Sequence, residues 1–508
     1  MDSGQVDPGQ DVQDRKKNKV GFMSYLPEIS AGTQALLRSG YGILMLCTIL
    51  WTLFPGRWFF HGARWGGYGD DREFSINLLQ NPFSRLLLTG LWTAAAVGLI
   101  TGTQTVLCAL INLAVCWFYF VRCRWNSLLR GMGAPGFFCY WLGAVTLFLE
   151  LGRYMDPSGR ILAVVVLVAQ VDFALIQLCA GSYKSVCGYS ANEGMQLGLA
   201  NPFWGHHWRF YKKMKPSHPL FVFLNQVSYR VQIVAALLML FPATRLIGAL
   251  AIAASFLFVM TQIRLGFLLP KVMVSSLLFV QAGSAADKFL GGLFSAPLSI
   301  QQTSWILPTW ASVLIAGFLT AYLMLLPLAK ACQWYNLLKG QSFPAPIQSF
   351  LEKWANAFGI IIWRVFSVDV INFFVQIYSG DQEYTTLGKA RWSNRFRYIM
   401  VAESIALTSI FTTLKYHPAD SEFFTDKLLR YARTVPCGRG QTVRFAYHEL
   451  DYSGERFEFV HTVDYIVDPK SGTVEVVNLR EHLEGPSASP VRPGARPGSY
   501  LPALPQTV

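Results

Sequence analysis

The residues of this chain whose types could carry chemistry gather in one stretch, residues 179–213. Lys184 lies about one helical turn beyond a long apolar run, and Glu193 and His206 follow it among glycines and aromatic residues. A lysine that is partly shielded from water can act as a general base. We therefore assign Lys184 as the candidate catalytic base, with Glu193 and His206 as its candidate proton partners. A lysine that anchors a helix end in the headgroup region is the alternative interpretation.

Two charged residues lie inside apolar runs, where a charge is costly and marks a candidate functional position. Asp172 lies twelve residues before Lys184, and Arg264 lies in the apolar segment "TQIRLGFL". We expect Asp172 to pair with Arg264 or Lys271. We expect Arg264 to contact main-chain carbonyl groups, a carboxylate or an anionic ligand. Both are assigned as candidate substrate-binding residues, and a structural clamp between helices is the alternative for Asp172.

Aromatic residues complete this candidate site, and Tyr183 and Trp204 are assigned to substrate binding. His206 and His207 are adjacent, so they cannot ligate one metal ion from a helix face as residues at i and i+4 do. We therefore expect no metal site. The chain has no P-loop, G-x-G-x-x-G, H-E-x-x-H or G-x-S-x-G motif, which argues against nucleotide-driven transport and the common hydrolase mechanisms. The cofactor is left unassigned.

The composition is that of a membrane protein. Of 508 residues, 52% are hydrophobic and only 14% are charged, whereas soluble domains carry about 25% charged residues. The net charge is +13, but the basic residues are scattered at the ends of apolar runs. That distribution suits contact with lipid headgroups. We expect the lipid bilayer as a partner, a hydrophobic small molecule as the ligand, and no nucleic acid.

A bilayer-spanning helix needs about 20 mostly apolar residues, and nine runs meet or approach this length. They centre on residues 42–54, 86–100, 106–121, 137–151, 161–179, 221–241, 246–263, 265–280 and 305–328. The second and third runs are joined by "TGTQT", which predicts a tight helical hairpin. The seventh and eighth nearly meet at Arg264, which indicates one bent helix and a re-entrant piece. We expect eight to ten spans in an all-α polytopic bundle over residues 35–335, after a disordered polar tail at 1–34.

The character of the chain changes beyond the last apolar run. We expect an interfacial amphipathic helix over 345–380, because the apolar stretch 358–378 is interrupted by two charged residues. A small extramembrane α+β region follows at 384–482, with a helix at 420–435 and three strands at 442–452, 456–468 and 472–479. The Pro-rich tail 485–508 is expected to be disordered. The location follows as integral to a membrane: the endoplasmic reticulum or a similar membrane in a eukaryote, the plasma membrane in a bacterium.

The segment "AGSYK" at 180–184, at the exit of an apolar run, resembles the alanine–glycine–x–x–lysine segment of vitamin K-dependent γ-carboxylases. It is also similar to the wider horizontally transferred transmembrane domain group and to lipase maturation factors. A family of uncharacterised bacterial and fungal transmembrane proteins is more similar still, through the segments 188–205, 261–267 and 411–434. This second resemblance covers roughly residues 40–480.

The resemblance to the carboxylases implies that Lys184 holds the position of the base that deprotonates a quinol cofactor. Only about a hundred residues of soluble character follow the membrane domain, which argues against protein carboxylation. We therefore expect an integral membrane enzyme that acts on a quinone, isoprenoid or lipid by base-assisted tailoring or cyclisation chemistry. The alternative is a non-catalytic maturation or assembly factor, or a carrier, in which the same residues clamp helices.

Overall fold

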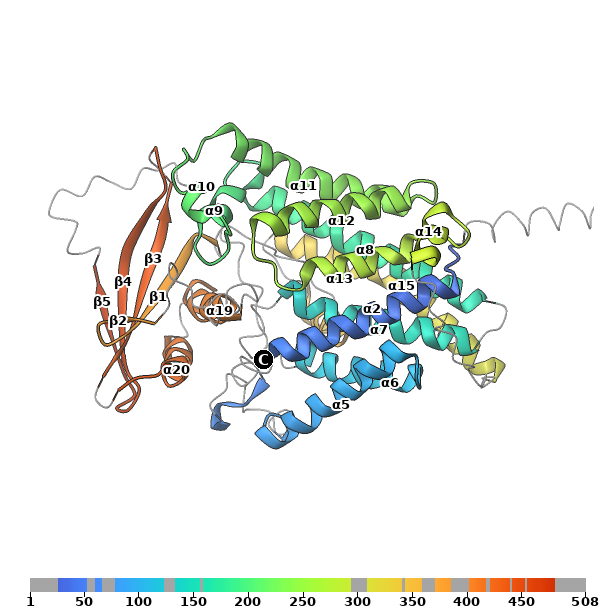
Figure 1. Ribbon diagram of the computed structural model, residues 1–508, viewed down its shortest axis with the longest axis horizontal. Coiled ribbons are helices and arrows are strands. Elements are labelled where there is room, and N and C mark those ends of the chain that lie inside the picture. The colour runs from blue at the N-terminus through green and yellow to red at the C-terminus, as the bar shows by residue number, and fades with distance from the viewer. Residues whose placement is uncertain are drawn as a thin grey trace, which may run out of the picture.

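The computed structural model places most of the chain in a helical bundle and a small sheet (Figure 1). The residues that it describes are 26–52, 60–65, 78–122, 133–155, 159–293, 308–339, 343–358, 371–384, 402–416, 421–438, 441–452 and 455–479. Residues 1–25 of the expected N-terminal tail and all of the expected tail 485–508 lie outside these ranges. The predicted bounds 1–34 are wrong at their end, because the first apolar helix already begins at Ala31.

Seven helices of the described part are long and apolar enough to cross a membrane. They are α2 (Ala31–Thr52), α5 (Pro82–Thr101), α6 (Thr105–Trp117) with the π-helical turn Phe118–Arg122, α8 (Arg160–Lys184), α11 (Pro219–Leu240), α12 (Arg245–Gln262) and α15 (Thr309–Lys339). Their outward faces carry exposed leucine, phenylalanine and valine residues, which suits contact with lipid. The polytopic helical bundle that the hydropathy predicts is thus present.

The described part of the chain holds fewer candidate spans than the eight to ten expected for the whole chain. The expected eighth run forms only the nine-residue α13 (Leu268–Ser276) and the 3-10 turn Leu277–Phe279, together too short to cross a bilayer. The expected fourth run forms α7 (Gly133–Met155), which is not one of the seven but packs between α6 and α8. The chain breaks at Ile263–Phe267 between α12 and α13, and the predicted re-entrant character of this segment stays a prediction.

The tight hairpin between α5 and α6 is confirmed. Gly102 adopts φ +77° and Gln104 φ 46°, and the amide of Thr103 donates to the carbonyl oxygen of Gly98 at 2.9 Å. A left-handed glycine ends the first helix and lets the chain reverse within three residues. The two helices then pack side by side (Figure 1).

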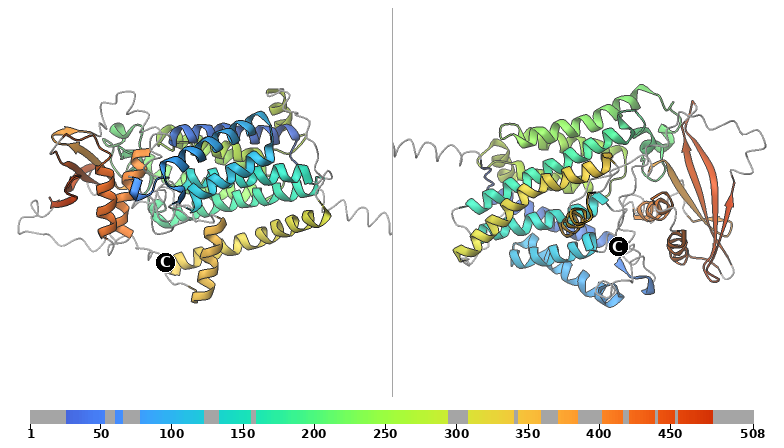
Figure 2. Two further views of the ribbon diagram at one scale, coloured as in Figure 1. Left: turned by 90° about the horizontal axis from the view of Figure 1, so that it is seen from below. Right: turned by 180° about the vertical axis from the view of Figure 1, so that it is seen from behind.

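The helix α8 lies at the centre of the bundle and packs against α7, α11 and α15. Figure 2 shows α15 along one side of the bundle, with α16 (Ala345–Phe358) crossing near its end. The short elements α9 (Met195–Ala200) and α10 (Trp208–Tyr211) follow α8 and lie beside the sheet (Figure 1). The helix α14 (Ala285–Leu293) packs against α2 at the end of the bundle that lies away from the sheet (Figure 1).

The extramembrane region is a five-stranded antiparallel sheet in the order β2-β1-β3-β4-β5. Its strands are β1 (Phe373–Ser379), β2 (Gln382–Glu383), β3 (Val443–Asp451), β4 (Glu458–Asp468) and β5 (Thr473–Asn478). The helices α19 (Ala402–Tyr416) and α20 (Ser421–Ala432) cover one face, where Phe411 and Phe424 pack on Tyr465 at 5.5 and 5.2 Å between ring centroids. Apolar alternation along β3 and β4 explains this half-buried arrangement.

The three strands and the helix predicted for the α+β region are confirmed, but the prediction of one helix over 345–380 is wrong at its end. Residues 345–358 form α16, residues 359–370 lie outside the described part, and 373–379 form β1. The segment "FFVQIYS" is apolar enough to suit either structure. Its pairing with β3, nearly seventy residues later in the chain, makes it a strand.

Candidate functional site

Lys184 is the last residue of α8, at the end of the bundle that meets the sheet. The chain continues as the π-helical turn Ser185–Tyr189, which is broken at Cys187 and at Gly188, where φ is +100°. The Lys184 side chain is half-buried, and its nitrogen lies 5.8 Å from the centroid of the Tyr189 ring. Within the described part of the chain, no hydrogen bond or ion pair involves this side chain.

The stripe of α8 that carries Lys184 faces α11. Gln177 accepts a hydrogen bond from the Gln232 amide at 2.8 Å. One turn later, a Cβ atom on Gly181 would lie 2.9 Å from the Ile233 side chain. Lys184 follows at the i+7 position of the same stripe. The small residue at 181 therefore lets α8 and α11 approach closely just before the lysine.

Tyr183 points instead towards α15. It is buried, and its ring centroid lies 6.5 Å from that of Trp334. Aromatic groups from α8, α15 and the π-helical turn thus surround the end of α8 near Lys184. A lysine in such surroundings offers a hydrophobic molecule both apolar contact and a basic nitrogen.

Glu193 and His206 do not join Lys184. Glu193 is exposed, and its charge acts with burial to raise the pKa of Tyr452, which follows β3. His206 is also exposed; partial burial of its ring lowers its pKa, as do the charges of Arg264 and His207. Neither residue lies within hydrogen-bond or ion-pair distance of the lysine among the residues described. The predicted proton partners therefore lie outside the immediate surroundings of the lysine.

Asp172 is buried in the middle of α8, about 18 Å along the helix axis from Lys184. The Trp141 indole donates to its carboxylate at 2.8 Å and the Tyr322 hydroxyl at 3.2 Å. The ammonium of Lys330 attracts it electrostatically. Asp172 therefore joins α7, α8 and α15, and the distance separates it from any chemistry at Lys184.

The predicted pairing of Asp172 with Arg264 or Lys271 is wrong. Lys271 donates to the Cys139 sulfur at 3.0 Å. Arg264 donates to the carbonyl oxygens of Pro202 and Phe203 at 2.6 and 3.1 Å. Of the partners expected for Arg264, main-chain carbonyl groups are thus the ones found.

The segment around Trp204 pairs with the chain that follows α12. The amide of Arg264 donates to the Trp204 carbonyl at 2.8 Å, and the amide of His206 donates to the Gln262 carbonyl at 2.9 Å. A Cβ atom on Gly205 would lie only 2.1 Å from the Leu199 carbonyl oxygen, so glycine is needed there. Trp204 is buried in this junction, and its contacts indicate a structural role.

The stretch from 190 to 215 joins the membrane bundle to the sheet. The Asn201 amide donates to the carbonyl oxygens of Ile371 and Phe373 at 2.7 and 2.8 Å. The ring of Trp208 lies 5.7 Å from that of Phe459, and Lys212 lies 3.7 Å from the centre of the same Phe459 ring. Much of the polar and aromatic character of this stretch therefore serves the contact with the sheet.

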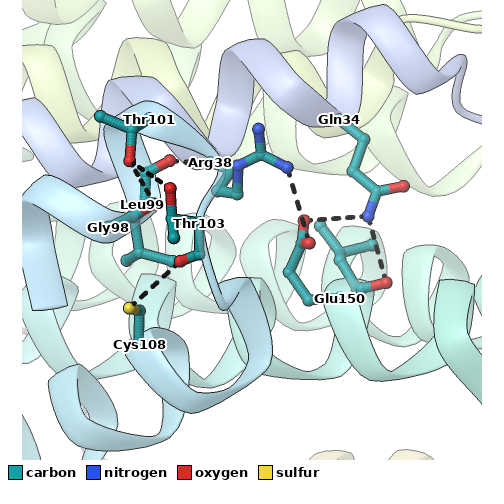
Figure 3. Close-up of polar contacts among 9 residues, drawn as sticks. Gln34, Arg38, Gly98, Leu99, Thr101, Thr103, Cys108 and Glu150 are labelled. Atoms are coloured by element: carbon teal, nitrogen blue, oxygen red, sulfur yellow. Dashed lines mark hydrogen bonds and ion pairs between the residues drawn. The ribbon is translucent and has the colours of Figure 1, made fainter. Parts of the chain in front are cut away.

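A second charged group inside the bundle was not foreseen. The guanidinium of Arg38 on α2 lies 3.6 Å from the Glu150 carboxylate on α7, and both side chains are almost fully buried. Arg38 also donates to the Leu99 carbonyl at 3.1 Å, and the Gln34 amide donates to Glu150 at the same distance (Figure 3). The signal was available: each is a charge within or beside an apolar run, as for Asp172.

Comparison with known protein families, with curated proteins and with solved structures finds no match to this chain. The resemblance to the carboxylase and maturation-factor group therefore stays a prediction. Among the described residues, no group of three or more His, Cys, Asp or Glu side chains could hold a metal ion.

Proposed function

We propose that this integral membrane protein binds a hydrophobic small molecule at Lys184 and removes a proton from it. The observation that supports this proposal is the environment of Lys184. It ends a membrane helix, lies half-buried beside the Tyr189 ring, and has no acidic partner among the described residues. A lysine without a carboxylate partner keeps its nitrogen available to a ligand.

The surroundings of Lys184 suit a quinone, isoprenoid or lipid. Tyr183 and Trp334 provide aromatic contact on the α15 side, and the lipid-facing helices give such a molecule access from the bilayer. The neutral amine of Lys184 would take the proton from an acidic C–H or O–H bond of the ligand, and the electron pair of that bond would stay on the ligand. The anion left on the ligand would then lie next to the new ammonium group, which stabilises it.

The proposed site contains fewer residues than the candidate site predicted from the sequence. Glu193 and His206 lie outside it, so the proton taken up by Lys184 would leave to water at the membrane edge. Asp172 and Arg264 hold helices and loops through their own partners. Tyr183 is retained as a ligand contact.

A non-catalytic role as an assembly factor or carrier is the second candidate. It is favoured by the polar side chains of α8, which bind neighbouring helices: Gln170 with Arg245 at 2.9 Å and Gln177 with Gln232 at 2.8 Å. In that case Lys184 would anchor the helix end, and an arginine would serve equally well.

The test compares Lys184→Ala and Lys184→Arg with wild type in cells that lack the protein, using untargeted lipid and metabolite profiling. Both variants should accumulate in the membrane at normal levels and lose the product that wild type restores. Lys213→Ala, at an exposed lysine of the same stretch, is the matched control and should restore it fully. Full restoration by Lys184→Arg would overturn the base assignment, and loss of membrane-inserted protein in both variants would support the anchoring role.

A further inference from the structure

The Arg38–Glu150 pair is incompletely satisfied by the side chains around it. The 3.6 Å contact is longer than a hydrogen bond. Arg38 Nη2 and Glu150 Oε2 are buried atoms without a hydrogen-bond partner in the described part of the chain. Burying an ion pair is costly unless further hydrogen bonds satisfy its remaining donors and acceptors. The pair therefore needs a third participant.

Further unsatisfied polar atoms are buried on the neighbouring helices. In the described part of α6 and α7 they include Oδ1 of Asn112 and Oγ1 of Thr105 on α6, and Oγ1 of Thr146 on α7. Thr146 lies one turn before Glu150 on the same helix. A threonine inside a helix commonly bonds a carbonyl oxygen of its preceding turn, as Thr48 does with Leu44 at 2.8 Å. The hydroxyl of Thr146 makes no such bond.

Helix register places the Arg38–Glu150 pair, Asn112 and Thr146 on neighbouring turns of α2, α6 and α7. Tyr41 on α2 lies against Cys116 on α6, with 3.8 Å between hydroxyl and sulfur. On α7, a Cβ atom on Gly143 would lie 2.7 Å from the same hydroxyl. One turn back along α2 is Arg38. The corresponding turn leads back to Asn112 on α6, which runs parallel to α2, and forward to Thr146 on the antiparallel α7; Glu150 follows one turn later, where Arg38 reaches it at 3.6 Å.

We propose that Arg38, Asn112, Thr146 and Glu150 enclose an internal site for ordered water within the membrane bundle. Water accepts a hydrogen bond from Arg38 Nη2 and donates to Glu150 Oε2 and to Asn112 Oδ1. The Thr146 hydroxyl can donate to it or accept from it. Buried waters typically make about three hydrogen bonds to otherwise unsatisfied polar groups, which is what these atoms offer.

The four side chains are so deeply buried that the site can hold water but not a larger ligand. The relative exposures of Arg38, Asn112, Thr146 and Glu150 are 2%, 0%, 1% and 0%. A lipid headgroup or the ligand proposed for Lys184 could reach these atoms only if the helices separated. The site is also distinct from Lys184, because Arg38 lies near the α5–α6 turn (Figure 3) and Lys184 lies at the end of the bundle that meets the sheet.

Two measurements on the full-length protein in lipid nanodiscs test this site. The first is thermal unfolding of Thr146→Val, which removes the hydroxyl and keeps the shape. Loss of a water-bonded hydroxyl should lower Tm by a few degrees and leave the water with fewer partners. If the hydroxyl had no partner, replacing it by a methyl group would leave Tm unchanged or raise it, and that result would overturn the proposal.

Thr48→Val is the matched control, because the hydroxyl of this buried threonine bonds its own helix. Its shift should be smaller than that of Thr146→Val, and an equal shift would count against the site. The second measurement is an experimental density map of the unsubstituted protein at a resolution that shows water. Density within hydrogen-bond distance of Arg38 Nη2 and Glu150 Oε2 would support the site. Direct contact between these two atoms would overturn it, as would density for a larger molecule.

Discussion

The side-chain amide of Asn201 donates a hydrogen bond at 2.8 Å to the carbonyl oxygen of Phe373, which lies 172 residues later in the chain. It also donates to the carbonyl oxygen of Ile371 at 2.7 Å. Its own oxygen accepts from the amide of Phe203 at 2.8 Å. One fully buried side chain therefore fixes the start of β1 against the loop that follows α8. Because β1 pairs with β3, this contact helps to set the position of the sheet relative to the helical bundle.

We expect Asn201→Ala to destabilise the protein by about 2–3 kcal/mol, since it removes two hydrogen bonds to buried carbonyl groups and one from the Phe203 amide. Thermal unfolding in detergent measures the loss, and proteolysis between the bundle and the sheet should become faster. Lys215→Ala is the control at the same junction, because the Lys215–Glu455 ion pair is exposed at both ends and contributes about 0–1 kcal/mol. Equal effects of the two substitutions would contradict the prediction.

Gly205→Ala should destabilise the junction by about 1–3 kcal/mol or more, because the added methyl group would overlap the Leu199 carbonyl. The expected readout is a lower Tm together with greater protease sensitivity of the 190–215 stretch. Gly90→Ala on α5 is the control. No atom lies within 4 Å of the position that its added methyl group would take, and alanine favours helix by up to about 1 kcal/mol. A neutral Gly205→Ala variant would show that the Gly205–Leu199 approach is not as close as described.

Arg38→Met should be among the most destabilising substitutions in the bundle, by about 3–5 kcal/mol, because it leaves the Glu150 carboxylate buried without its counter-charge. The double variant Arg38→Met/Glu150→Leu should recover most of that loss, since two apolar side chains need no desolvation. Denaturation of the single and double variants in the same detergent measures the coupling. Additive losses would mean that the two charges do not interact.

Stability should fall on acidification between about pH 6.5 and pH 4 through His448 of β3. Its ring lies between Phe374, at 4.9 Å, and His461, at 4.6 Å. Burial and the neighbouring His461 lower its pKa to about 4, from an ordinary value of about 6.5. Between those values the unfolded chain binds a proton that the folded chain does not, so stability rises with pH across this window and is lost as pH falls.

The loss from His448 has an upper limit of about 3 kcal/mol, because the ring is only partly buried. Thermal unfolding from pH 7 to pH 4 measures it for wild type and for His448→Phe. The phenylalanine keeps the stacked ring and removes the titrating group, so its pH dependence should be weaker than that of wild type. Parallel curves for the two proteins would assign the effect to other groups.

Local pattern was sufficient for much of the fold. Apolar runs located the helices, "TGTQT" predicted the hairpin between α5 and α6, and β-branched and aromatic alternation predicted β3, β4 and β5. Each of these signals is carried by residues close together in the chain. The segment 373–379 was misassigned because its apolar residues suit helix and strand alike, and its partner strand lies far along the chain.

The sequence by itself determined that the chain forms helices long and apolar enough to cross a membrane, and that Lys184 lies at the end of one of them, because hydropathy and helix length are local properties. Only the tertiary structure decided which hydrogen-bond or ion-pair partner each polar side chain has. In the folded protein Lys184 lies apart from Glu193 and His206. Asp172 accepts hydrogen bonds from Trp141 and Tyr322. Arg38 forms an ion pair with Glu150. The physical reason is that a buried charge must be satisfied by whichever group packing brings to it, and packing depends on the arrangement of all the helices together.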